Sequence, residues 1–330
     1  MILTVYKNGN SKRLYISSWV SLLWQTKFNE YGNFTLELSV PIKKTISSEY
    51  PEIGDYIAMS EDDEVMIVTT VQRTLTRYIV SGFSVDWVLT KRVSTDIIKN
   101  KTLTQAMNTL IGRMESWGSL TVSPNSLTVD RYNGTISDGT LYDYAHTIAL
   151  ATNTGFKVTL GDESFLTLLC YSYNARKDRN YDVNLVPLED YTYSKSENEY
   201  ANYAVVAGQG TGEERITTTV YIGETLPTQK QRREVYIDAR SEQMGKDETM
   251  EQYIERLQNY GMKKLLELYI IENEKIKFYD SDLNVGDLFT FFDGTNTRNV
   301  PVIGKTLKYQ NGDVSKTYEY GTPIITKRGK

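Results

Sequence analysis

Apolar and polar residues alternate along the first hundred positions of the chain. At residues 34–40 every second residue is apolar, so that four apolar side chains share one face. A period of two is typical of a β-strand with one buried face. Further strands are predicted at residues 2–6, 14–19, 53–59, 65–71 and 78–83. Short strands at this spacing favour a barrel or a sandwich.

The pattern then changes to the period of an α-helix. Between residues 103 and 117 apolar residues recur at alternating steps of four and three, and Thr102 with Gln105 can form a capping box. A second helix is predicted at residues 141–152, with Gly155 as a left-handed cap. A hairpin of residues 156–160 and 165–171 is expected to follow it.

Strands return in the C-terminal half of the chain. They are predicted at residues 200–207, 216–222, 234–239, 275–279, 285–292, 300–309 and 315–320. A helix with apolar residues at helical spacing interrupts them at residues 250–268.

These elements predict a mainly β fold with α+β insertions. We expect two tube-like antiparallel β-barrels, a small α/β domain and an inserted helix. The first barrel is assigned to residues 1–97 and the α/β domain to residues 98–183. The second barrel is assigned to residues 184–330, with its helical insertion around residues 246–270.

The two β-regions open in the same way. Gly54-Asp55 is preceded and followed by apolar residues, as is Gly286-Asp287, and a polar turn and two strands come after each pair. In this alignment residues 65–71 match residues 300–307, and residues 78–82 match residues 317–321. An internal duplication is one interpretation. The alternative is that a glycine bend with a capping aspartate is common in small barrels.

Length and charge narrow the function classes. A chain of 330 residues is expected to form roughly two to three domains. Its formal net charge of −5 leaves no basic footprint, so tight nucleic-acid binding is not expected as the main function. No apolar stretch approaches the roughly 20 residues that span a bilayer, and no signal sequence opens the chain. We expect a soluble protein that is synthesised in a cytoplasm.

The chain has one histidine and one cysteine, and neither lies in a catalytic or metal-binding motif. His146 has no second ligand at helical spacing, so a surface or packed histidine is expected. Cys170 lies in an apolar run, where a buried, inert thiol is expected. A single cysteine also excludes an intrachain disulfide and a cysteine-based zinc site. We therefore predict no catalytic residue, no metal and no cofactor.

Two other patterns could be mistaken for a binding or catalytic site. The glycine-rich residues 208–212 lack the Lys-Ser/Thr pair of a phosphate-binding loop and precede a strand, so a hairpin turn is predicted. The acidic residues at 61–64, 213–214 and 280–282 are interpreted as solvated turns. A hydrolase would need two facing carboxylates, and that alternative stays open at this point.

A short basic run precedes the strand at residues 234–239. Arg232 and Arg233, with Lys230, are too few for a nucleic-acid patch. Arg215, Arg232 and Arg233 are candidate subunit contacts.

Several segments together resemble the hub protein family of siphophage tails. These segments are residues 30–36, residues 199–210, Glu214-Arg215 and residues 233–240. The family is related in fold to the central baseplate hub of contractile-tailed phages and to the N-terminal part of tail-associated lysins. The resemblance covers nearly the whole chain and implies a tail-tip protein of the virion that is made in the bacterial host cytoplasm.

The resemblance also implies an assembly. Three copies, each with two tube-like barrels, would form a homotrimeric ring of pseudo-sixfold symmetry that closes the distal end of the tail tube and opens for DNA. The implied partners are the distal tail protein, the tail tube, the tape-measure protein and a receptor-binding or lytic tail protein. Because the sequence ends at Lys330 without a peptidoglycan-cleaving segment, no lytic role is expected for this chain.

Two rival functions remain open at this point. A carbohydrate-binding or cell-wall-cleaving tail protein would need an exposed aromatic platform or a facing carboxylate pair. A hub of a contractile tailocin or injection particle cannot be separated from the first interpretation by sequence.

Overall fold

The computed structural model describes most of the chain. The described residues are 1–7, 11–40, 50–94, 97–117, 120–122, 132–135, 139–152, 154–160, 166–171, 174–182, 188–223, 225–228, 230–268, 271–278, 283–292, 294–295, 297–310, 312–320 and 328–329. Of the predicted strand ends, Phe165, Tyr279 and Gly321 lie outside the described residues, as does the acidic segment 280–282. The fold is mainly β, as predicted.

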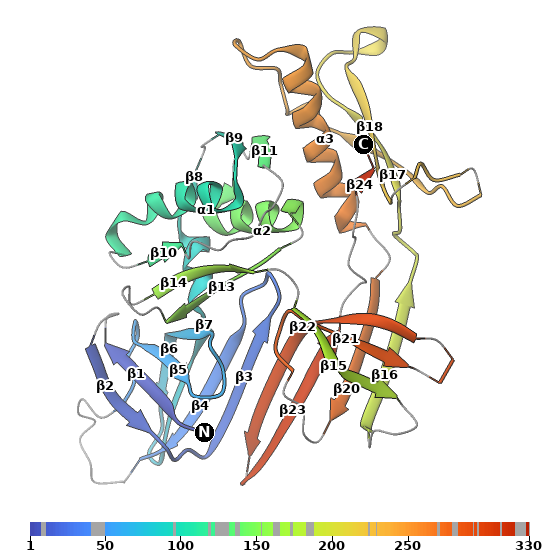
Figure 1. Ribbon diagram of the computed structural model, residues 1–330. Coiled ribbons are helices and arrows are strands. Elements are labelled where there is room, and N and C mark those ends of the chain that lie inside the picture. The colour runs from blue at the N-terminus through green and yellow to red at the C-terminus, as the bar shows by residue number, and fades with distance from the viewer. Residues whose placement is uncertain are drawn as a thin grey trace.

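A curled sheet of thirteen strands forms the base of the molecule (Figure 1). Its main path runs through β16 (Leu188–Ser196), β20 (Ile271–Phe278), β23 (Asp313–Tyr320), β22 (Thr297–Gln310), β3 (Ser21–Lys27), β4 (Asn33–Ser39), β7 (Arg77–Ser84), β6 (Val65–Arg73), β5 (Tyr56–Met59), β1 (Leu3–Lys7) and β2 (Ser11–Ile16). Beside this path β21 (Asp287–Phe292) pairs with β22, and β15 (Asn174–Asp182) pairs with β21. The sheet thus joins two strand groups from opposite ends of the sequence.

The alternation in β4 has the predicted consequence. Phe34, Leu36 and Leu38 are buried, and the residues between them are partly exposed. They pack with Leu22 and Trp24 of β3 in a core that also includes side chains of β1, β5, β6 and β7. Burial of such apolar side chains is the main favourable term in the stability of the sheet.

The joint between the two strand groups is the pairing of β22 with β3. The two strands run antiparallel, and seven residue pairs connect them, from Gly304 opposite Lys27 to Gln310 opposite Ser21. Leu307 of β22 is opposite Trp24 and belongs to the same core as the strands of the N-terminal group.

A small α/β unit covers one end of the N-terminal group. It contains η1 (Val85–Lys91), β8 (Val93–Ser94), β9 (Ile97–Lys101), α1 (Leu103–Ile111), η2 (Gly112–Trp117), β10 (Leu120–Val122), β11 (Tyr132–Thr135), β12 (Gly139–Thr140), α2 (Leu141–Thr152), β13 (Gly155–Leu160) and β14 (Leu166–Tyr171). The predicted capping box of Thr102 and Gln105 is present, with both reciprocal hydrogen bonds. The residues after Ile111 continue as a 3-10 helix rather than an α-helix.

The prediction for Gly155 was wrong. This residue has no left-handed backbone conformation and begins strand β13. Close packing explains why position 155 is a glycine, because a Cβ atom there would lie 2.6 Å from the ring of Tyr171 and 2.7 Å from the ring of Phe28.

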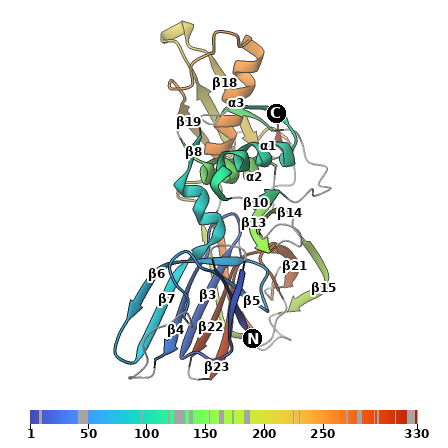
Figure 2. The ribbon, with the colours of Figure 1, turned by 90° about the vertical axis from the view of Figure 1, so that its left-hand side faces the viewer.

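A third unit consists of a four-stranded sheet and one long helix. Its elements are β17 (Tyr203–Ala207), η3 (Gly212–Glu214), β18 (Thr217–Ile222), β19 (Glu234–Asp238), α3 (Met250–Glu267) and β24 (Arg328–Gly329). The predicted barrel had included residues 200–239, but these strands pair with one another and not with the large sheet. The reason is that the apolar stripe of α3, which includes Leu257 and Leu265, covers their face. Figure 2 shows the three parts stacked from the sheet at the base to α3 at the top.

No helix among the described residues is both long enough and apolar enough to cross a bilayer.

Candidate assembly interface

The first Gly-Asp pair forms the turn that leads into β5. Gly54 has φ of 90°, a left-handed conformation that favours glycine. The Gly54 amide donates a hydrogen bond of 2.9 Å to the Val68 carbonyl of β6. Asp55 closes the turn, because its Oδ2 accepts a hydrogen bond of 2.8 Å from the Glu52 amide.

The second pair forms the same turn before β21. Gly286 has φ of 91°, and its amide donates to the Val302 carbonyl of β22 at 2.9 Å. The Asp287 Oδ2 accepts from the Asn284 amide at 2.9 Å. Conformation, hydrogen-bond pattern and distances therefore agree at the two positions that the sequence singled out.

The strands after the two turns also agree. β5, β6, β7, β4 and β3 are neighbours in that order, and β21, β22, β23, β20 and β16 are neighbours in the corresponding order. The pairing of β6 with β7 is irregular between Val68 and Thr70, and that of β22 with β23 between Val302 and Gly304. The groups differ at their margins, because β1 runs antiparallel to β5 whereas β15 runs parallel to β21.

The two strand groups differ in how their edges are used. β22 pairs with β21 through its first half and with β3 through its second half. β6 pairs with β5 through residues 65–67, and beyond Val68 no described strand lies on its outer side. Among the described strands β16 is paired on one side alone, with β20. The outer side of β6 beyond Val68 and the outer side of β16 are therefore edges to which another strand could be added.

Charged residues connect the two strand groups and the α/β unit. Lys305 of β22 is 6% exposed, and its Nζ lies 3.1 Å from the Asn284 Oδ1 and 3.4 Å from an Asp62 carboxylate oxygen. The Lys157 Nζ forms an ion pair of 2.7 Å with Asp63. The acidic turn at residues 61–64 thus holds parts of the molecule together.

The prediction that this whole turn is solvated was wrong. Glu64 is 4% exposed and lies close enough to Asp86 for their charges to interact. Ser84 donates a short hydrogen bond to Asp86, and the Gly32 amide donates to the Ser84 hydroxyl at 2.8 Å. Burial raises the pKa of Glu64 well above its ordinary value, and Asp86 and Asp62 raise it further. Burial also raises the pKa of Asp86 to about 6.

Arg215 lies in the third unit and bonds within the chain. Its Nη2 is 2.7 Å from Asp238 and 3.1 Å from the Ala207 carbonyl, and its Nε donates to the Gly208 carbonyl at 3.2 Å. Asp238 also accepts hydrogen bonds from Arg240, which are the main reason why the pKa of Asp238 falls to about 2. Arg215 therefore fixes the end of β17 to the end of β19.

Arg232 and Arg233 lie at the opposite end of the same strands. The Arg232 Nε is 2.6 Å from Glu234, and its guanidinium lies 3.4 Å from the centre of the Tyr203 ring. Arg233 is exposed, and its backbone amide donates a hydrogen bond of 2.8 Å to the Asn202 Oδ1. Both residues are thus positioned on the surface of the third unit rather than on the large sheet.

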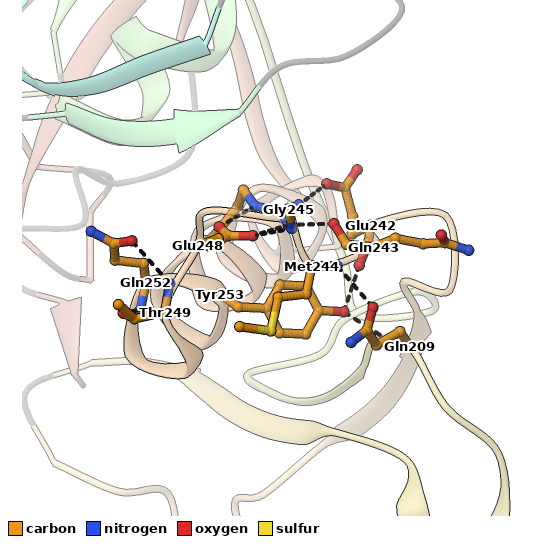
Figure 3. A network of polar contacts seen from close by, with 10 residues as sticks. Gln209, Glu242, Gln243, Met244, Gly245, Glu248, Thr249, Gln252 and Tyr253 are labelled. Atoms are coloured by element: carbon orange, nitrogen blue, oxygen red, sulfur yellow. Dashed lines mark hydrogen bonds and ion pairs between the residues drawn. The ribbon is translucent and has the colours of Figure 1, made fainter.

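The polar network before α3 could not be found from sequence (Figure 3). Arg256 forms a bidentate contact with Glu248, with distances of 3.0 and 2.9 Å, and a third contact of 2.6 Å with Glu242. The Tyr253 hydroxyl donates to the Glu242 carbonyl and accepts from the Gln209 amide at 2.8 Å. The network fixes the glycine-rich turn at residues 208–212 to α3. This turn connects β17 with β18, as the predicted hairpin requires. The spacing of these residues gave no recognisable motif.

The single histidine and the single cysteine are both packed against other residues. His146 stacks on Tyr142 with a centroid distance of 6.4 Å, and burial, with Lys263 nearby, lowers its pKa. Cys170 is 1% exposed, and burial raises the pKa of its thiol to about 12, so the reactive thiolate is disfavoured. Among the described residues no cluster of three His, Cys, Asp or Glu side chains could hold a metal ion.

Several solved structures with the same fold are tail proteins. A 43 kDa tail protein of prophage MuSo2 from Shewanella oneidensis has a TM-score of 0.65 at 11% identity, over 99% of this chain and 100% of that one. A tail protein from Neisseria meningitidis MC58 has a TM-score of 0.62 at 11% identity, over 98% and 97%. The prophage tail protein gp18 from Listeria monocytogenes EGD-e has a TM-score of 0.61 at 10% identity, over 99% and 96%.

The sequence itself matches none of the curated proteins. A family model does match it over residues 67–293, which is more than half of the chain. With the shared fold, this confirms the predicted resemblance to tail proteins of siphophages. The chain belongs to the family of siphovirus ReqiPepy6 Gp37-like proteins.

Proposed function

We propose that this chain is the hub subunit of a phage tail tip, and that three copies form a ring of pseudo-sixfold symmetry that closes the tail tube. The observation that carries the proposal is the pair of matching strand groups joined edge to edge in one chain. A trimer can match a sixfold partner if each subunit repeats the contacting unit, and the two Gly-Asp turns support such a repeat.

The free face of the sheet supports a role in DNA passage. On the face opposite the core, a row of uncharged polar residues crosses four neighbouring strands, namely Thr317, Thr306, Gln25 and Asn33. The same face also carries charges of both signs, because Arg77 forms an ion pair of 3.0 Å with Glu37, and Lys308 and Glu319 lie there as well. DNA carries one negative charge for about every 1.7 Å of duplex axis, so a strongly basic wall would retain it and a neutral wall would not.

The observed carboxyl pair gives little support to a hydrolase. Glu64 and Asp86 are only 4% and 2% exposed, so a glycan chain cannot reach them without opening the core. A structural role agrees better with carboxyls that are enclosed between packed elements.

Assembly in the virion follows from the same proposal. The hub would be synthesised in the bacterial host cytoplasm and join the tail tip there. Its neighbours would be the distal tail protein, the tail tube and the tape-measure protein, with a receptor-binding or lytic protein beyond it. Arg215, Arg232 and Arg233 would lie away from the channel, at subunit contacts or on the outer surface.

Electron cryo-microscopy of the purified chain at high concentration, and of tail tips that contain it, tests the proposal. We expect three copies around a channel, with the polar face of the sheet toward the channel. Another stoichiometry, or a channel lined with lysine and arginine, would contradict it.

A further inference from the structure

The sheet has one joint inside the chain, and the two strands that correspond to those of the joint each have an open edge among the described strands. The joint pairs β22 with β3. In the matched order of strands β6 corresponds to β22, and β16 corresponds to β3. We propose that residues 70–72 of β6 pair antiparallel with residues 194–196 of β16 from the next copy. This inference rests on the proposed ring, and it names the residues that close it.

The register follows from residue correspondences in the two strand groups. The irregular pairing after Val68 in β6 corresponds to the one after Val302 in β22. Thr70 is therefore the counterpart of Gly304, and two positions further along the strand Gln72 is the counterpart of Thr306.

The correspondence for β16 is obtained through the neighbouring strands. Gly82 is opposite Val68, as Tyr320 is opposite Val302. Across the next pairing, Gly82 is opposite Phe34 and Tyr320 is opposite Glu274.

One pairing further, Phe34 is opposite Trp24, and Glu274 is opposite Tyr193. Trp24 is therefore the counterpart of Tyr193, and Gln25 is the counterpart of Ser194. By the same count Lys27 is the counterpart of Ser196.

The joint inside the chain then gives the contact between copies. Within the chain Thr306 is opposite Gln25 and Gly304 is opposite Lys27. Replacing each residue by its counterpart places Gln72 opposite Ser194 of the next copy. It also places Thr70 opposite Ser196 of the next copy.

The residues on both edges suit this pairing. Thr70 and Gln72 are exposed, as are Ser194 and Ser196, so no core has to open. Small hydroxyl and amide side chains can face one another across antiparallel strands without burying an unpaired charge. The occupant is inferred to be a second copy because this chain already contains the same joint, with strands of the same two kinds.

Ring closure also explains why the edges are open. An exposed edge presents unpaired amide and carbonyl groups and invites uncontrolled association. When β6 of each copy pairs with β16 of the next copy, both of these edges are covered in every subunit. Such head-to-tail contacts form a closed ring when repeated rotation from one copy to the next completes a full turn.

Disulfide trapping in the full chain tests the register. In a Cys170→Ser background, the chain with both Gln72→Cys and Ser194→Cys should form a covalent three-chain species on mild oxidation, seen on a non-reducing gel. A mixture of the two single variants should give covalent species of two chains and none larger. The matched control is the pair Gln25→Cys and Thr306→Cys, which are opposite one another inside the chain and should join without a change in mass.

The outcomes separate this inference from the proposed function. Native mass spectrometry of the unoxidised protein at high concentration gives the number of copies independently. Three copies without the disulfide between residues 72 and 194, while the control pair oxidises, would overturn the strand pairing and leave the ring intact. A disulfide between two copies of Gln72→Cys alone would also overturn it. A monomer at high concentration would overturn the ring and the pairing together.

Discussion

Removal of the buried carboxyl of Asp86 should change how stability depends on pH. Burial raises the pKa of Asp86 from its ordinary 3.8 to about 6, and Glu64 lies beside it. Between these two values the folded chain holds a proton that the unfolded chain releases. The stability contributed by the protonated Asp86 is therefore present below about pH 4 and is lost as the pH rises through about 6.

The size of the effect follows from the shift. One pKa unit corresponds to about 1.4 kcal/mol, so a shift from 3.8 to about 6 corresponds to about 3 kcal/mol in full. Part of this is already lost at pH 4, which leaves about 2–3 kcal/mol between pH 4 and pH 8. The asparagine of the Asp86→Asn variant does not titrate, and loss of the Asp86 charge lowers the pKa of Glu64, which acts in the same direction. The free energy of unfolding of the variant, minus that of the wild type, should therefore rise by about 2–3 kcal/mol or more over this range.

Urea unfolding of both proteins at pH 4, 6 and 8 measures this difference. If asparagine fails to make a hydrogen bond that Asp86 makes, the difference in the free energy of unfolding shifts equally at all three pH values. Such a shift would not produce the expected rise of the difference with pH. Asp63→Asn is the matched control, because Asp63 lies in the nearby acidic turn with its side chain 63% exposed. Its ion pair with Lys157 is at the surface, so its difference should vary by less than about 1 kcal/mol. A pH-independent difference for Asp86→Asn would refute the reasoning.

Two further predictions concern single side chains and turns. Tyr253→Phe should lower the free energy of unfolding by about 1–3 kcal/mol in urea titrations, because it removes the partner of the Gln209 amide in a packed region. Gly54→Ala and Gly286→Ala should each lower the melting temperature, with a cost of about 1–2 kcal/mol for a side chain in the left-handed region. Gly286→Ala should cost more than Gly54→Ala, because its Cβ would lie 2.5 Å from the Tyr171 ring. Gly112→Ala is their control and should be neutral or stabilising, because Gly112 has φ of −55° and open space around it. Equal stability of all three glycine variants would contradict the role assigned to the turns.

The sequence predicted what depends on near neighbours. The period of two at residues 34–40 gave β4, and the capping box at Thr102 gave the start of α1. The Gly-Asp turns were visible because a left-handed residue and a capping carboxylate lie next to each other in the chain. Such signals are complete within a few residues, so no tertiary information was needed.

The sequence could not predict contacts between distant segments. Glu64 looks like a turn residue, but it is buried, with a bridge to Thr159 of β13 and with Lys157 and Ser84 near enough to favour its charged form. Lys305 looks like an exposed strand residue until Asp62 and Asn284 are placed beside it. Each of these polar residues is buried because a partner far along the chain compensates for its desolvation, and no local pattern records that partner.

The position of the two smaller units bears on how the ring could meet a tube. The turn after β3 lies against the α/β unit, where the side-chain amide of Asn29 donates a hydrogen bond of 2.9 Å to the Thr154 carbonyl. The hairpin turns β6–β7 and β22–β23 lie at the other end of the sheet, because their strands pair there with the opposite ends of β4 and β3. Leu75 and Val314 lie at these turns and are 85% and 51% exposed. The continuous sheet holds both hairpins at one end. Each copy in the proposed ring would therefore present two similar hairpins to the next layer of a tail, and the α/β unit and the third unit would not obstruct them, because they lie at the opposite end of the sheet.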